Sequence, residues 1–204
     1  RIQSLMGDPG GSGGILGQVN SLFSAFSTLS DNAISGPYRQ QALSQTQVLF
    51  DEATRIAGQI QAVREGADAR ISAGVARANE LLSQIEAMNV EISRASVAGG
   101  DTTGAEAAQA SLIDQLSGIM DIRVSVRPVG GVQIRTGTGM LLAGDGHATL
   151  EYQRAGAVNA ETAFDDIWLT EPRGAKRSLL DHLGSGELRG LVELRDQEAP
   201  AASQ

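Results

Sequence analysis

Residues 37–96 read PYRQQALSQTQVLFDEATRIAGQIQAVREGADARISAGVARANELLSQIEAMNVEISRAS, and this stretch decides the fold. Apolar residues recur in it at steps of three and four, the spacing of one face of an α-helix. In chain order they are Ala42, Leu49, Ala53, Ile56, Ile60, Val63, Ala67, Ile71, Val75, Ala78, Leu82, Ile85 and Ile92. Pro37 stands where helices favour their start. The pattern predicts one helix of about 60 residues, roughly 90 Å long if unbroken.

The apolar seam is a heptad repeat with one interruption. Between Leu49 and Ala67 the steps alternate four and three, and between Ala67 and Val75 two fours follow each other. Such a stutter locally unwinds a supercoil. Three glycines in the helix, at positions 58, 66 and 74, each cost about 1 kcal/mol relative to alanine. They predict bends or sites where another segment approaches closely.

Two shorter helices accompany this rod. Residues 15–30 follow a glycine-rich loop at 7–14 and carry apolar residues at helical spacing. These are Leu16, Val19, Leu22, Phe23, Phe26 and Leu29. Residues 105–120 follow a polar turn at 97–104, and Ala108, Leu112, Leu116 and Ile119 share one face. We expect this third helix to fold back on the rod as an antiparallel partner.

After Asp121 the period of the apolar residues changes to two, which indicates strands. Residues 122–126 and 132–136 predict a β-hairpin around a Pro-Val-Gly-Gly turn. Residues 140–143 and 148–153 predict a second pair of strands around Gly144-Asp145-Gly146, and residues 164–170 a further strand. The segment 187–198 predicts a helix.

The predicted fold class is therefore α+β, a long antiparallel helical rod or bundle with a small β-hairpin-rich region. We expect residues 1–120 to form the helical rod. Residues 121–204 would form the β-hairpin region that returns to a C-terminal helix and packs on the rod.

Composition narrows the possible functions. The net charge is −8 and lysine occurs once, so the chain lacks the basic face that nucleic-acid binding requires. No apolar run approaches the roughly 20 residues of a membrane span. Cysteine is absent, which excludes disulfides and thiolate chemistry. Aromatic residues make up only 3% of the chain, so the core must be built from Ala, Leu, Ile and Val, as suits helices packed side by side.

Residues that could bind a metal are scattered. His147 and His182 lie 35 residues apart, whereas a helical zinc site pairs histidines at short spacing. Asp165, Asp166 and Glu171 form the densest acidic group, but adjacent residues of a strand point to opposite faces. We expect a solvated edge there, and a weak calcium contact is the alternative.

Nucleophile motifs give no catalytic candidate either. Ser185 lies between two glycines but does not match GxSxG, and the chain contains no SxxK or HExxH. The one GxSxG match, at positions 10–14, falls in the glycine-rich loop. The sequence therefore predicts no catalytic, cofactor-binding or metal-binding residues and no enzyme. Trp168, the single tryptophan, is expected in the core, with a surface contact as the alternative.

Four stretches carry a family resemblance: Ser21–Phe26 with Arg39–Gln45, then Leu81–Ile92, Leu112–Val124 and Ser185–Asp196. They resemble, in the same order, patterns of flagellar hook-associated protein 1, the family that joins hook to filament. The second is similar to INxLLxQIAxLNxxI, the third to LLDELSxLVDIRV and the fourth to GGxLGGLLxxRD. One departure is Ala108-Gln109-Ala110, where the family often has Gln-Arg-Asp.

The resemblance implies a non-enzymatic adaptor in the extracellular bacterial flagellum, exported by the flagellar secretion apparatus. It implies contacts with hook protein, with flagellin or another junction protein, with a secretion chaperone, and with further copies in a ring. The chain would be the flagellin-like middle domain without the terminal polymerisation helices, and hence a monomer by itself. The alternative function is a ligand- or surface-binding module on an extracytoplasmic coiled-coil stalk, which would require a concave pocket rimmed by polar groups.

Overall fold

The computed structural model describes residues 14–201. Three helices come first: α1 (Ile15–Asp31), α2 (Gly36–Val97) and α3 (Thr103–Ile119). Six short strands and a short helical C-terminal segment follow, so the predicted α+β class is confirmed. No helix among the described residues combines the length and apolar character of a membrane span. The predicted glycine-rich loop lies outside the described residues except for Gly14.

The chain forms two compact units, and the boundary between them falls inside α2. The first unit contains the chain up to Arg64 and the C-terminal residues from Asp196, and the second runs from Glu65 to Arg195. The predicted division into a rod of residues 1–120 and a β-region of residues 121–204 stays a prediction.

The first unit has a small core. Ile56 and Ile60 of α2 are buried with Ala199 of α5 (Ala199–Ala201), and Ile15 and Val63 pack against them. Leu16, Phe23 and Phe26 of α1, which recur at helical spacing, are largely exposed, whereas Ala25 is buried. The α2 seam is only partly buried in this unit, since Ile56 and Ile60 are buried but Ala53 is exposed.

The second unit buries the rest of the seam. All seven apolar positions from Ala67 to Ile92 are buried, which confirms this half of the predicted face. They are Ala67, Ile71, Val75, Ala78, Leu82, Ile85 and Ile92. Of the three helix glycines, Gly74 provides a close approach, since an added Cβ would lie 2.9 Å from Leu188 Cδ2. At Gly58 and Gly66 an added Cβ would meet nothing within 4 Å.

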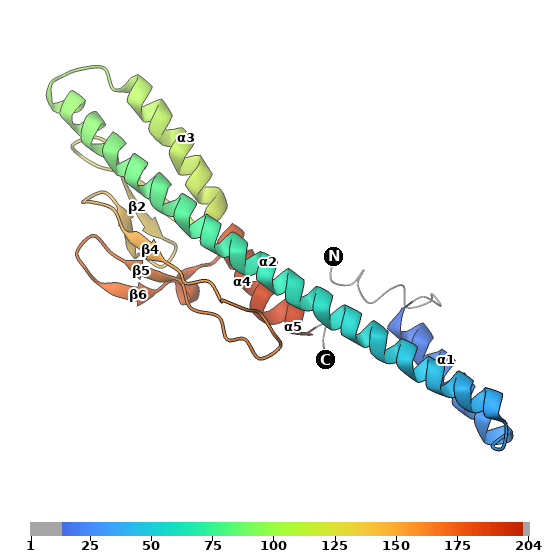
Figure 1. Ribbon diagram of the computed structural model, residues 1–204. Coiled ribbons are helices and arrows are strands. Elements are labelled where there is room, and N and C mark those ends of the chain that lie inside the picture. Colours follow the sequence, from blue (N-terminus) through green and yellow to red (C-terminus); the bar gives the residue numbers. More distant parts are fainter. Residues whose placement is uncertain (1–13, 202–204) are drawn as a thin grey trace. The chain divides into compact units, whose positions relative to one another are not determined.

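Helix α3 doubles back along α2 (Figure 1). Leu116 and Ile119 are buried as predicted, but Ala108 is exposed and its neighbour Gln109 is buried instead. Gln109 donates to the Asn89 Oδ1 atom at 2.9 Å. At this level the inward position of α3 is therefore Gln109 rather than Ala108, because Asn89 of α2 offers it a hydrogen-bond acceptor.

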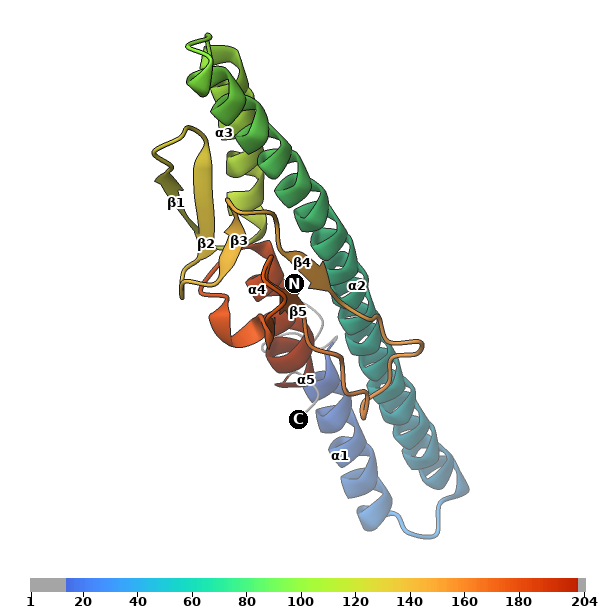
Figure 2. The ribbon, with the colours of Figure 1, turned by 90° about the vertical axis from the view of Figure 1, so that its left-hand side faces the viewer.

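The strands form two three-stranded antiparallel sheets that lie along α2 (Figure 2). The first has the order β1 (Ile122–Val126), β2 (Val132–Thr136), β3 (Leu141–Ala143), and its β1–β2 hairpin is the predicted one. The second has the order β4 (Thr149–Glu151), β5 (Trp168–Thr170), β6 (Lys176–Ser178).

The predicted pairing of residues 140–143 with residues 148–153 is wrong. β3 pairs with β2 and β4 pairs with β5, so the two strands belong to different sheets. Within residues 14–201 a single isolated bridge joins Ala143, the end of the first segment, to His147, the residue before the second. The predicted strand over 164–170 shortens to Trp168–Thr170, and β6 was not predicted.

The C-terminal segment returns to the helices through a tight turn at Gly186. A short 3-10 helix (Leu180–His182) precedes it, and α4 (Glu187–Glu193) continues directly into a π-helical turn (Leu194–Glu198). Gly186 has a φ of +100°, and an added Cβ would lie 2.7 Å from the Ile119 carbonyl oxygen and from Met120 Cα. Glycine is required here both for its backbone conformation and for space.

Replacing Gly186 by alanine should therefore lower the free energy of unfolding by about 2–4 kcal/mol, because the Cβ meets backbone atoms that cannot rotate away. Chemical denaturation followed by circular dichroism measures this. Gly190→Ala is the matched control, since its Cβ would meet nothing within 4 Å. Alanine favours a helix, so the control should be neutral or stabilise by up to about 1 kcal/mol. Equal stability of the two variants would contradict the argument.

Candidate interaction surface

Two asparagine side chains of α2 pair with strand main chain, one in each sheet. Asn79 donates from Nδ2 to the Leu150 carbonyl and accepts at Oδ1 from the Leu150 N–H, both at 2.8 Å. Asn89 does the same with Val132, at 2.9 and 2.7 Å. A carboxamide presents a donor and an acceptor side by side, as a strand does, so each amide takes the place of a neighbouring strand.

Glu86, one turn before Asn89, holds the loop between the sheets. Its carboxylate accepts the backbone N–H groups of Gly144 at 2.8 Å and Gly146 at 3.0 Å. It also accepts a hydrogen bond from Asn89 Nδ2 at 2.9 Å. An added Cβ at Gly131 would overlap Asn89 Oδ1, and the φ of Gly131 is +75°. The hairpin can therefore approach α2 this closely only with glycine next to Val132.

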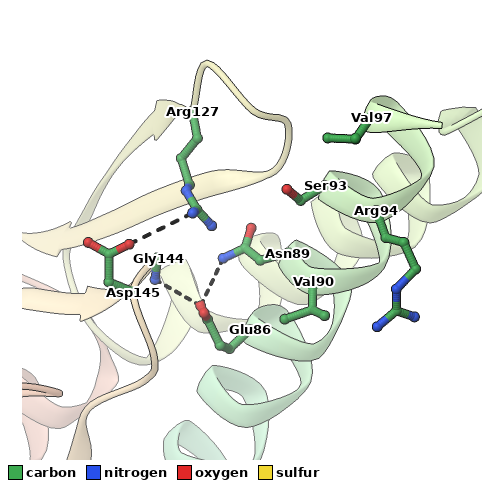
Figure 3. Close-up of a pocket in the computed structure, with 9 residues that line it drawn as sticks. All are labelled: Glu86, Asn89, Val90, Ser93, Arg94, Val97, Arg127, Gly144 and Asp145. Atoms are coloured by element: carbon green, nitrogen blue, oxygen red, sulfur yellow. Dashed lines mark hydrogen bonds and ion pairs between the residues drawn. The ribbon is translucent and has the colours of Figure 1, made fainter. Parts of the chain in front are cut away.

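An open groove of about 450 Å³ lies beside these contacts (Figure 3). Its lining comes from the last turns of α2, the β1–β2 hairpin and the Gly144 loop: Glu86, Asn89, Val90, Ser93, Arg94, Val97, Arg127, Gly144 and Asp145. Arg127 points toward Asp145, at 3.7 Å, whereas Arg94 turns away from the other lining residues. The hydrogen bonds of Glu86 and Asn89 go to the protein's own main chain, to each other and to Gln109.

A buried polar cluster ties α2 to the segment after β4 and to the π-helical turn. The Tyr152 hydroxyl donates to Asp68, which is fully buried, and accepts from Arg195 Nη1 at 2.5 Å. Arg154 reaches the other Asp68 oxygen at 3.4 Å, and the Arg195 guanidinium lies 4.4 Å from the Phe164 ring centroid. Burial, together with the hydrogen bond to Asp68, raises the pKa of Tyr152 above its ordinary value. The hydroxyl therefore stays protonated as a donor.

The structure does not bring together the histidines and carboxylates that were considered as metal ligands. No cluster of three or more potential ligands occurs among residues 14–201. His147 is exposed beside the Ala148 carbonyl, and His182 lies in the 3-10 helix, where its Nδ1 is buried without a hydrogen-bond partner. Asp165 accepts the N–H of Asp166, and Glu171 accepts the N–H of Leu141 at 3.4 Å.

Two further predicted positions lie on the surface. Ser185 is exposed in the turn before α4. Trp168 was expected in the core, but it is 36% exposed, because its neighbours in the chain, Ile167 and Leu169, take the inward positions. Lys176 of β6 lies 5.8 Å from its ring centroid. The alternative of a surface position is therefore the correct one for Trp168.

No sequence motif marks the α2 side chains that bind the strands and the buried tyrosine. Asn79 and Asn89 look like ordinary polar interruptions of a helix, and their partners lie 71 and 43 residues away. The available signal was that each asparagine stands within the buried seam, next to Ala78 and three residues before Ile92. Asp68 likewise follows the buried Ala67.

A long helix that carries two small sheets on side-chain amides defines an α+β domain. The family model described as the flagellar hook-associated protein FlgK helical domain matches residues 1–204, and the chain belongs to this family.

A solved structure supports the fold. The chain is similar to the flagellar hook junction protein FlgK from Burkholderia pseudomallei, with a TM-score of 0.78 at 20% sequence identity. The match covers 97% of this chain but 36% of that one, so the chain spans about a third of the neighbour's length. No curated protein sequence matches the chain.

Replacing Asn89 by aspartate should destabilise the second unit. The change keeps the shape and the Oδ1 acceptor, but it places a carboxylate oxygen against the Val132 carbonyl and Glu86. We expect a loss of about 3 kcal/mol at pH 7, because buried acceptors then face each other without a proton. Urea denaturation measures it. Gln84→Ala, which removes a contact to Glu80 on the exposed face, should stay within about 0.5 kcal/mol. An Asn89→Asp variant with an unchanged free energy of unfolding would contradict the role of the amide.

The raised pKa of Tyr152 can be measured directly. The chain has two tyrosines, so a Tyr38→Phe variant leaves Tyr152 alone. Its tyrosinate absorbance should develop well above the usual value of about 10 in the native protein and return to about 10 in denaturant. Because the unfolded chain loses this proton first, the contribution of Tyr152 to stability is present below about pH 10 and declines above it. Identical native and denatured titrations would contradict the buried hydrogen bond.

Proposed function

We propose that the chain is a non-catalytic adaptor segment of the bacterial flagellum, at the junction of hook and filament. The observation that carries the proposal is the match of the FlgK helical-domain model to residues 1–204. The similar structure is that of a flagellar hook junction protein, which supports the same function.

The proposal has specific consequences for partners and location. The full-length protein acts outside the cell, after export by the flagellar secretion apparatus. It contacts hook protein on one side and flagellin or another junction protein on the other. It also associates with further copies in a ring, and a secretion chaperone binds it before export. The exposed side chains of α1 and α2, among them Phe23, Phe26 and Phe50, support a role that depends on packing against other helices.

The groove beside Glu86 favours the adaptor over the alternative of a ligand-binding module. Its polar floor is already occupied by the protein's own contacts, since Glu86 accepts three hydrogen bonds and Asn89 takes part in four. A small-molecule site needs convergent polar groups that remain available to a ligand. Arg127 is the side chain best placed at the rim, and it faces Asp145.

A complementation experiment tests the adaptor function. A flagellated strain that lacks its own copy of the gene is given the full-length gene, either unchanged or with Asn89→Asp in this segment. The unchanged gene should restore swimming and cell-bound filaments. The destabilised variant should leave flagellin in the medium, because subunits arrive at a hook without a stable junction.

Gln84→Ala is the matched control, and it should behave as the unchanged gene does. Immunoblots of the secreted fraction show whether each variant is exported. A gene-deleted strain that keeps its filaments and swims normally would overturn the proposal.

A further inference from the structure

β1 is an outer strand of its sheet, and its outward edge has no partner among the described residues. Arg127 donates its N–H to the Gly131 carbonyl at 3.0 Å, which marks these two residues as a hydrogen-bonded pair. Such pairs alternate along an antiparallel ladder. The main-chain groups of Arg123 and Ser125 therefore face β2, and those of Val124 and Val126 point outward.

The apolar face of this sheet continues onto β1 without cover. Val124 pairs with Ile134, which is fully buried, and Val126 pairs with Val132. Paired residues share a face of the sheet, so both valines extend the core face. Yet Val124 is 45% exposed and Val126 is 84% exposed. The first sheet thus ends on a strand whose edge and inner face are both open.

The charge at this edge is basic, although the chain is acidic. Residues 122–136 contain three arginines and no Asp or Glu, while the whole chain carries a net charge of −8. Arg123 and Arg127 are four residues apart and share the face opposite Val124 and Val126. Arg123 is exposed and forms no ion pair within residues 14–201, and Arg127 is 3.7 Å from Asp145.

The outer strands β3, β4 and β6 differ from β1, because each is short, charged or hydrogen-bonded to another segment. On β4, Leu150 is bound by Asn79. On β3, the Leu142 carbonyl accepts the N–H of Ala148. β6 has three residues, and its Lys176 is bound to Glu151 at 2.7 Å. Short, charged or covered edges are the usual protection against strand pairing.

We propose that β1 binds an extended, acidic segment of another protein by strand addition. The added strand takes the outward N–H and C=O groups of Val124 and Val126. Its Asp or Glu side chains face Arg123 and Arg127, and its alternating apolar side chains cover the two valines. Main-chain bonds supply affinity in this mode of recognition, and alternate side chains supply specificity.

A labelled peptide of alternating valine and glutamate tests the proposal against residues 1–204, with binding followed by fluorescence anisotropy and by amide NMR shifts. Arg123→Glu should weaken binding about tenfold, since attraction becomes repulsion. Val124→Pro should abolish binding, because proline removes the outward backbone N–H of residue 124, while the hydrogen bonds between β1 and β2 remain. The shifts should centre on Val124 and Val126.

Two controls test whether binding depends on β1 and on the charge of the peptide. Arg177→Glu on β6 should leave the affinity unchanged, and a valine–lysine peptide should not bind. Absence of binding, shifts confined to other strands, or equal affinity of the Arg123→Glu variant would overturn the proposal. So would self-association of the unmodified chain that Val124→Pro abolishes, because the occupant would then be a second copy. Should Val124→Pro fail to fold, Arg123→Glu decides alone.

Discussion

The second unit depends on the pairing of two asparagine amides with strand main chain. A strand edge placed against a helix exposes N–H and C=O groups that water can no longer reach, and unpaired buried groups are costly. Asn79 and Asn89 each hydrogen-bond the N–H and C=O of one residue, in a different sheet, and so fix where each sheet lies along α2. Ten residues separate them, roughly 15 Å along the helix axis. Apolar packing alone would allow the sheets to slide, whereas directional hydrogen bonds specify a register.

The same contacts explain what the sequence could predict. The seam from Ala67 to Ile92 follows from helical periodicity, and the β1–β2 hairpin follows from alternation and a glycine turn, because both signals are local. The pairing of β3 does not follow, since Gly144-Asp145-Gly146 has the composition of a hairpin turn. The chain does turn there and closes one bridge, between Ala143 and His147, but the next strand, β4, then pairs with β5. The N–H groups of Gly144 and Gly146 also bind Glu86, which lies 58 and 60 residues away, and a contact at that distance leaves no local signal.

The buried polar cluster shows a second limit of sequence reasoning. Asp68 and Arg195 are both buried, and removing charges from water is expensive unless each is paired and hydrogen-bonded. Tyr152 lies between them, donating to the carboxylate and accepting from the guanidinium. Nothing in residues 152 or 195 marks them as partners of position 68. Removing any one member would leave a buried charge without its partner, which is strongly destabilising.

The two units differ in how far they bury their own apolar residues, and this bears on an adaptor. The second unit encloses a continuous core from α2, α3, both sheets and α4. The first buries Ile56, Ile60 and Ala199 but leaves Phe23, Phe26 and Phe50 largely exposed. Aromatic side chains bury 150–250 Å² each when covered, roughly, and dominate the energetics of interfaces. A segment with few buried contacts opens at a lower free energy than a packed core. The first unit therefore leaves large aromatic side chains open to a neighbour, whereas the second unit buries most of its apolar residues within its own core.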